Sequence, residues 1–180
     1  FPDEPVHKAT LLRFQLARDD LDGAETFLRE LVAASPADDT TAQGDLIQFL
    51  AEYRSIDAAK AEIAATVAGQ ADPLPFLIID AGLDFASGAP ATAITTLETA
   101  IAGNPGSAQI TTAQVTLARM LTSMGNDVGA RARIEDALVT DPTNPDALKL
   151  RAGWLIAADQ PDDAINALRT ALDTRPDDAA

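Results

Sequence analysis

The sequence predicts an all-α fold, an α-solenoid of about five helix hairpins, and three observations lead to this prediction. First, Pro2 and Pro36 are 34 positions apart, and so are Pro142 and Pro176. Second, the residues before each of the later two prolines follow one pattern of turn, alanine, apolar residue and small residue. A fixed period of this length is typical of stacked repeats, in which each unit buries its apolar face against its neighbours. Third, 47% of the residues are hydrophobic but only 4% are aromatic, so small aliphatic side chains must form the core.

The pattern is clearest in the predicted repeat 145–178. The predicted first helix carries apolar residues three and four positions apart, a turn follows at Asp159, and the second helix continues the spacing; these residues are Leu148, Ala152, Leu155, Ala164, Leu168 and Ala171. Such spacing places them on one stripe of each helix. The alanines allow the two helices to approach closely, and we expect Pro176 to end the second helix because the residue before proline resists helical geometry.

The same pattern predicts four earlier repeats, at 5–39, 40–73, 74–110 and 111–144, within one solenoid domain. Small residues recur at the equivalent positions Ala81, Ala93, Ala100, Ala118, Ala130 and Ala137. Asn144-Pro145 and Gln160-Pro161 predict helix starts, because proline lacks only an N–H that is unpaired there. Ala108-Gln109-Ile110 predicts an extra turn before the fourth repeat.

This arrangement resembles the tetratricopeptide repeat family over nearly the whole chain, and the resemblance implies a right-handed superhelix. Some residues depart from the family's pattern. The bulky aromatic position of the first helix is occupied by Lys8, Gln43, Leu77, Gln114 and Leu148. Leu12, Leu31 and Thr66 stand where small residues are usual, and Asp80 and Asp84 suggest that the helix from Leu74 is rotated by one residue.

The two ends predict that the chain is a piece of a longer array. Residues 1–4 have the pattern of the end of a preceding repeat, and residues 176–180 that of the beginning of a further one. Solenoids normally finish with a polar capping helix, which the pattern does not include. Exposed repeat ends would favour self-association.

Charge and composition exclude several classes of partner. The chain has 13 Lys and Arg against 28 Asp and Glu, a formal net charge of −15. Such a field repels nucleic acid and anionic membrane surfaces, whose binding requires cations. The most apolar stretch, Leu74–Ile79, is far shorter than the roughly 20 residues of a membrane-spanning helix. The excess of Asp is typical of a solvated acidic surface, and a high-salt habitat is the alternative.

The residues for catalysis are missing from the sequence, so we expect no enzyme, cofactor or metal site. The chain has no Cys and a single His, His7, for which a surface or packing role is expected. Asp20-Leu21-Asp22-Gly23 partly matches a calcium loop, but Arg18 and Arg29 occupy required ligand positions. Trp154 has two interpretations, packing at a repeat boundary or contact with a ligand.

The family resemblance implies a concave groove, lined by the inward face of each first helix, that holds a peptide. By register, that face carries Arg13, Gln48, Glu52, Ile78, Phe85, Val115, Arg119, Lys149 and Ile156. Its three cations favour a peptide with an acidic or C-terminal carboxylate end, and chance placement is the alternative. The family's clamp for chaperone tails is not predicted, because Ala9 and Arg13 occupy its first two positions.

We therefore expect a protein–protein interaction scaffold or adaptor. The Ala- and Asp-rich composition suggests a bacterial protein, and the later repeats resemble long envelope arrays, including those of exopolysaccharide systems. This resemblance implies a periplasmic or envelope-associated segment of an assembly or secretion machine. The alternative is a regulatory or substrate-delivery segment of a larger protein that contains an enzyme, which would fit a cytoplasmic location.

Overall fold

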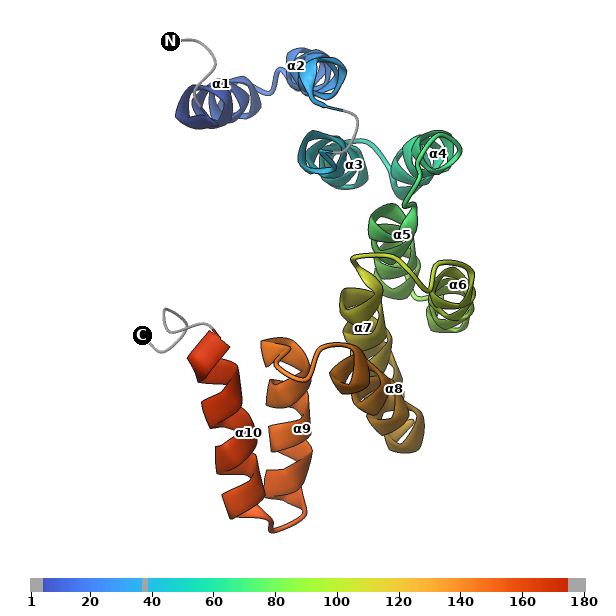
Figure 1. The fold of residues 1–180 in the computed structure, drawn as a ribbon. Coiled ribbons are helices and arrows are strands. Elements are labelled where there is room, and N and C mark those ends of the chain that lie inside the picture. The colour runs from blue at the N-terminus through green and yellow to red at the C-terminus, as the bar shows by residue number, and fades with distance from the viewer. Residues whose placement is uncertain (1–4, 37–38, 175–180) are drawn as a thin grey trace. The chain divides into compact units, whose positions relative to one another are not determined.

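The computed structural model describes residues 5–36 and 39–174, and these form ten α-helices and no strand. The predicted roles of Pro2 and Pro176 lie outside the described residues, as do the side chains of His7 and Lys8. The helices are arranged as five consecutive hairpins, as predicted (Figure 1). They divide into two compact units, residues 1–70 and residues 71–180, which are described separately below.

The first unit, called unit 1, contains two hairpins. Its helices are α1 (Pro5–Ala17), α2 (Leu21–Ala34), α3 (Thr41–Tyr53) and α4 (Ile56–Val67). Each helix packs against the next one in the chain. The buried apolar side chains of this unit are Ala24, Leu28, Leu46, Ile47, Phe49, Leu50, Ala59 and Ile63.

The second unit, called unit 2, contains three hairpins. They are formed by α5 (Leu74–Ala86) with α6 (Pro90–Gly103), α7 (Ile110–Ser123) with α8 (Asp127–Thr140), and α9 (Pro145–Ala157) with α10 (Pro161–Thr174). Helix α7 lies against α6, and α9 lies against α8, so neighbouring hairpins share walls. The predicted extra turn is present before α7, and Ile110 already belongs to the helix.

Local signals set the helix ends. Pro145 and Pro161 begin α9 and α10 as predicted, and the side chain of Asn144 accepts a hydrogen bond from the Ala147 N–H. Asn126 caps α8 in the same way through the Gly129 N–H, at 3.0 Å. A Cβ atom at Gly129 would lie only 2.8 Å from the Asn126 amide nitrogen, so a larger residue there would require the Asn126 side chain to shift. Such caps satisfy N–H groups that have no partner inside the helix.

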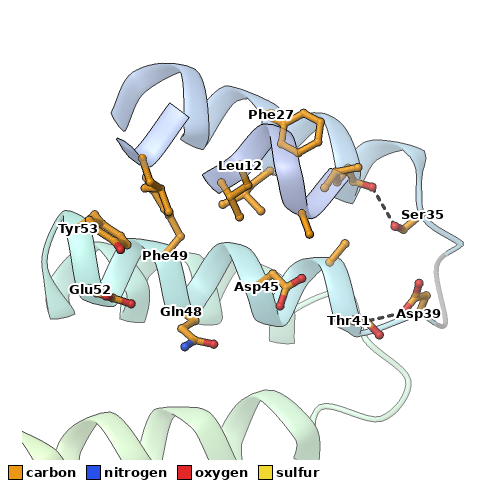
Figure 2. Close-up of a pocket in the computed structure, with 15 residues that line it drawn as sticks. Leu12, Phe27, Ser35, Asp39, Thr41, Asp45, Gln48, Phe49, Glu52 and Tyr53 are labelled. Atoms are coloured by element: carbon orange, nitrogen blue, oxygen red, sulfur yellow. Dashed lines mark hydrogen bonds between the residues drawn. The ribbon is translucent and has the colours of Figure 1, made fainter. Parts of the chain in front are cut away.

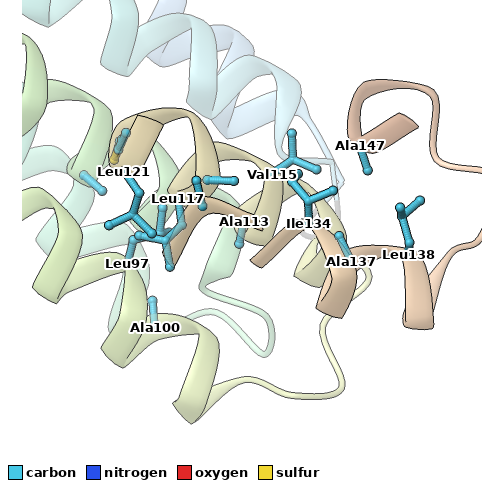
Figure 3. Packing of buried hydrophobic residues seen from close by; sticks show 14 of the residues in the cluster. Leu97, Ala100, Ala113, Val115, Leu117, Leu121, Ile134, Ala137, Leu138 and Ala147 are labelled. Carbon is cyan, nitrogen blue, oxygen red and sulfur yellow. The ribbon is translucent and has the colours of Figure 1, made fainter. Parts of the chain in front are cut away.

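The core of unit 2 is made of aliphatic side chains separated by alanines (Figure 3). Leu97, Leu117 and Ile134 are fully buried between the helices. The small residues at the repeat positions are at most 5% exposed: Ala81, Ala93, Ala100, Ala118, Ala130, Ala137, Ala152, Ala164 and Ala171. Helix α5 contributes Leu74 and Ala81 to this core, and Leu77 packs against it as a partly buried side chain. Phe76 and Asp84 of the same helix are also buried.

Trp154 has a packing role in unit 2. Its ring packs against the core as a partly buried side chain. The Arg131 guanidinium of α8 lies over the ring, 5.6 Å from its centroid. This cation–π contact joins α8 to α9, two helices that belong to consecutive hairpins.

Two departures from the family pattern compensate each other in unit 1. Gln43 occupies the usual aromatic position and is only 9% exposed. Its amide donates hydrogen bonds to Thr66 Oγ1 at 2.7 Å and to Glu62 Oε1 at 3.0 Å, and Glu62 also pairs with Arg29 of α2 at 3.0 Å. The hydroxyl of Thr66 thus replaces the usual small residue with a partner for a buried amide, which would otherwise be costly to bury.

The buried alanines generate the first prediction. Ala164→Leu in α10 should lower the free energy of unfolding by about 1–3 kcal/mol, because the extra side-chain carbons have no space between α9 and α10. Urea unfolding followed by circular dichroism measures this change. Ala132→Leu, at an exposed position of α8, is the control and should leave stability nearly unchanged. Equal stability of wild type and Ala164→Leu would refute the close approach of these helices.

The Gln43–Thr66 hydrogen bond generates the second prediction. A double-mutant cycle of Gln43→Leu and Thr66→Val should show a coupling of about 0.5–1.5 kcal/mol, because each single variant leaves a polar partner without its hydrogen bond. Urea unfolding of the four proteins measures the coupling. The control cycle combines Gln48→Leu with Thr66→Val. Gln48 is exposed on the same helix as Gln43, and this cycle should give no coupling. A coupling of zero in the first cycle would contradict the compensation.

Candidate functional site

A pocket of about 540 Å³ opens in unit 1 between α1, α2 and α3. Figure 2 shows Leu12 and Phe27 on one side of it and Asp45 of α3 on the other. Most of its lining is apolar: Ala9, Leu12, Leu16, Phe27, Leu28, Leu31, Ala42 and Phe49. A volume of a few hundred Å³ with a mainly apolar lining is typical of ligand-binding pockets.

Polar residues of the pocket come mainly from α3 and from the segment before it. Three of them are carboxylates, Asp39, Asp45 and Glu52, and no Lys, Arg or His lines the pocket in the described part of the chain. Asp39 accepts a hydrogen bond from the Thr41 N–H at 2.9 Å. The pocket therefore joins an apolar interior to a negatively charged rim.

The pKa shifts reflect this environment. The pKa of Asp45 is raised, mainly because neighbouring side chains partly desolvate its carboxylate and secondarily because Asp39 is negatively charged. The pKa of Asp39 is lowered by its hydrogen bonds with Thr41. The pKa of Tyr53 is raised, chiefly by its hydrogen bond to Glu52. Asp45 therefore has an environment that disfavours its charged form, through partial desolvation and a like charge nearby.

Two arginines of unit 1, Arg29 and Arg54, form ion pairs with acidic residues outside the pocket. Arg29 contacts Glu25 and Glu62, both at 3.0 Å. Arg54 contacts Glu25 at 3.0 Å and also Asp22. None of these acids lines the pocket. The ion pairs connect α2 with α4 and with Arg54 at the end of α3, and they leave the rim of the pocket acidic.

Of the three unit 1 residues predicted to line a groove, two line this pocket. Gln48 and Glu52 lie along it on α3, and both are exposed. Arg13 is exposed on α1, and its neighbour Leu12, not Arg13 itself, lines the pocket.

The six predicted groove residues of unit 2 have varied environments. Val115 is 5% exposed and belongs to the core, and Ile78 and Phe85 are partly buried against that core. Arg119, Lys149 and Ile156 are exposed, Ile156 to 61%. Arg119 pairs with Asp146 at 3.3 Å, so part of the positive charge expected on this face is neutralised within the unit.

Sequence reasoning did not identify the apolar wall of the pocket. Leu12 and Leu31 were visible only as large residues at positions where the repeat pattern has small ones, and both line the pocket. A large residue at such a position is therefore a usable sequence signal for an opening between repeats, because it prevents the close approach that alanine permits.

Unit 2 has a second, more polar pocket of about 560 Å³ beside Pro142, between α9 and α10. It is lined by polar side chains such as Arg151, Gln160 and Asp163. No group of three metal-binding side chains occurs within residues 5–36 and 39–174. In these same ranges, no helix has both the length and the apolar character needed to cross a membrane.

Comparison with known proteins supports the repeat pattern directly. A family model described as tetratricopeptide repeat matches residues 84–153. A comparison with curated proteins found no match.

Solved structures of similar fold cover almost the whole chain. The crystal structure of MamA has a TM-score of 0.60 at 19% identity, over 92% of this chain and 94% of that one. PilF of Pseudomonas aeruginosa has a TM-score of 0.64 at 16% identity, over 92% and 74%. YrrB, described as a TPR protein with an unusual peptide-binding site, has a TM-score of 0.54 at 16% identity, over 97% and 88%.

These likenesses establish the fold at low sequence identity, and the model match establishes the repeat type in the middle of the chain. Together with ten helices in five hairpins, they confirm an all-α solenoid fold of about five repeats. Residues 84–153 match the tetratricopeptide repeat, and the described fold is that of tetratricopeptide repeat solenoids.

Proposed function

We propose that the chain is a protein–protein interaction scaffold that holds a segment of a partner protein in the pocket of unit 1. The observation that carries this proposal is the apolar pocket of about 540 Å³, which opens along the exposed face of α3 where Gln48 and Glu52 lie. Apolar pockets with a polar rim anchor the central side chains of protein interfaces. The likeness to YrrB, a protein described by its peptide-binding site, supports the same role.

Unit 2 would contribute separate contacts to a partner. Its first helices expose Arg119, Lys149 and Ile156. We propose that these side chains contact acidic and apolar groups of the partner, as the family resemblance implies. Scaffolding of this kind needs no catalytic group, and the proposal includes no reaction.

The proposed setting is a bacterial envelope assembly or secretion system, with the chain in the periplasm. It is supported by the fold likeness to PilF and to PilW, which is described as a widely conserved type IV pilus biogenesis factor and matches with a TM-score of 0.60 at 17% identity. The alternative is a regulatory or substrate-delivery segment of a larger, enzyme-containing protein. A leader sequence or a fused catalytic domain in the full reading frame would distinguish the two.

The third prediction concerns the pocket as a binding site. Peptides selected from a random display library on the immobilised chain should lose at least about tenfold in affinity for Ala42→Phe, because the added ring would fill the pocket. Fluorescence anisotropy of labelled peptides measures the affinities. Ala132→Phe, the same change at an exposed position of α8, is the matched control and should leave affinity unchanged.

Thermal melting of both variants by circular dichroism checks that each is folded. If the selected peptides bind Ala42→Phe as tightly as the wild type, the partner site lies elsewhere and the assignment to this pocket is wrong.

A further inference from the structure

We infer that the pocket of unit 1 accepts a cationic amphipathic helix of a partner protein, with its apolar face in the pocket and its Lys or Arg side chains against Asp45 and Glu52. This inference rests on the proposed function and specifies the chemistry of the partner.

The length of the pocket favours a helix. Its lining extends along α3 from Thr41 to Tyr53, a distance of about 18 Å at 1.5 Å per residue, which is about three helical turns. The lining residues of α3 include Ala42, Asp45 and Phe49, which are three and four positions apart and therefore share one face. Grooves between helices bind the apolar face of another helix. The described residues include no strand to which an extended segment could add.

The apolar walls supply the anchor sites. Leu28, at 1% exposure, is part of the wall from α2. Leu12 and Leu16 of α1 and Phe27 of α2 are only partly buried, so part of their surface remains available to a partner. Burial of this surface by leucine or phenylalanine side chains of the partner is favourable, because it removes apolar surface from water.

The negatively charged side chains at the pocket rim favour a positively charged partner. Asp39, Asp45 and Glu52 line the pocket together, and none of the Lys or Arg side chains described forms an ion pair with Asp45 or Glu52. By contrast, Glu25 and Glu62 of the same unit are already paired with arginines. A partner cation would therefore meet carboxylates whose negative charge is not neutralised, whereas a partner carboxylate would meet like charges.

The charge of the chain also argues against a second copy as the occupant. Each copy has a formal net charge of −15, and two such surfaces repel each other. A positively charged segment of another protein would instead be attracted by the negative charge of the chain.

Three synthetic helical peptides of about 18 residues test the inference. They share one Leu- and Phe-containing face and differ only at the four flanking positions, which are Lys, Gln or Glu. Fluorescence anisotropy with the whole chain, in about 150 mM salt, should show that the Lys peptide binds at least about tenfold tighter than the Gln peptide, with the Glu peptide weakest.

Charge-neutral variants separate the pocket from the general field of the chain. Asp45→Asn with Glu52→Gln should reduce the preference for Lys over Gln to less than about threefold. The matched control removes two charges elsewhere, through Glu30→Gln and Glu98→Gln, both exposed and outside the pocket. This control variant should still prefer the Lys peptide over the Gln peptide at least about tenfold. An equal fall in both double variants would mean that only the overall charge acts, and the inference would be wrong.

The remaining outcomes separate this inference from the proposed function. If the Gln or Glu peptide binds as tightly as the Lys peptide, and Ala42→Phe abolishes that binding, the pocket is a binding site but the partner is not cationic. If neither Ala42→Phe nor Ala9→Trp, a second blocking variant at an exposed wall position, weakens the tightest peptide, both proposals fail. Self-association of the chain that Ala42→Phe abolishes would assign the pocket to a second copy and overturn the inference.

Discussion

Close contact between helices at buried alanines is the constraint on which the rest of unit 2 depends. In the second helices, Ala93, Ala130 and Ala164 are buried next to the hairpin turns, at most 2% exposed. A methyl side chain lets two backbones approach so that the larger residues, such as Leu97 and Ile134, fill the space on either side. Because protein interiors are packed as densely as crystals, this geometry repeats wherever the alanines repeat. A core with few aromatic residues is sufficient as a result.

Unit 1 shows what happens where the constraint is relaxed. Leu12 and Leu31 stand at positions where the pattern has small residues, and both line the open pocket. Unit 1 thus keeps apolar surface of α1, α2 and α3 accessible in this pocket. Elsewhere in the unit, the Gln43–Thr66 pair shows a different solution, in which a polar pair replaces an aromatic residue and a small one and satisfies its own hydrogen bond.

Electrostatics adds selectivity to this packing. The chain carries a large excess of acids, yet the arginines are placed on particular ones: Arg29 and Arg54 on Glu25, and Arg119 on Asp146. The Arg54–Glu25 and Arg119–Asp146 pairs connect different helices, whereas the Arg29–Glu25 pair lies within α2. Among the described residues, no arginine or lysine forms such an ion pair with Asp45 or Glu52, so the pocket rim is negatively charged like most of the chain. The positive charge expected on the groove face is reduced at Arg119, because Arg119 forms an ion pair with Asp146.

The fold was predictable from the chain alone, because helix-forming stripes, turn residues and prolines act over short distances and recur every 34 or so residues. Pro145, Pro161 and the buried alanines such as Ala118 have their predicted positions. The site was only partly predictable: Gln48 and Glu52 line the pocket, whereas Val115 is in the core. Tertiary structure decided the pocket itself, the Gln43–Thr66 bond and the pairing of Arg119. Each of these depends on which side chains from different helices meet, and the spacing along one helix does not contain that information.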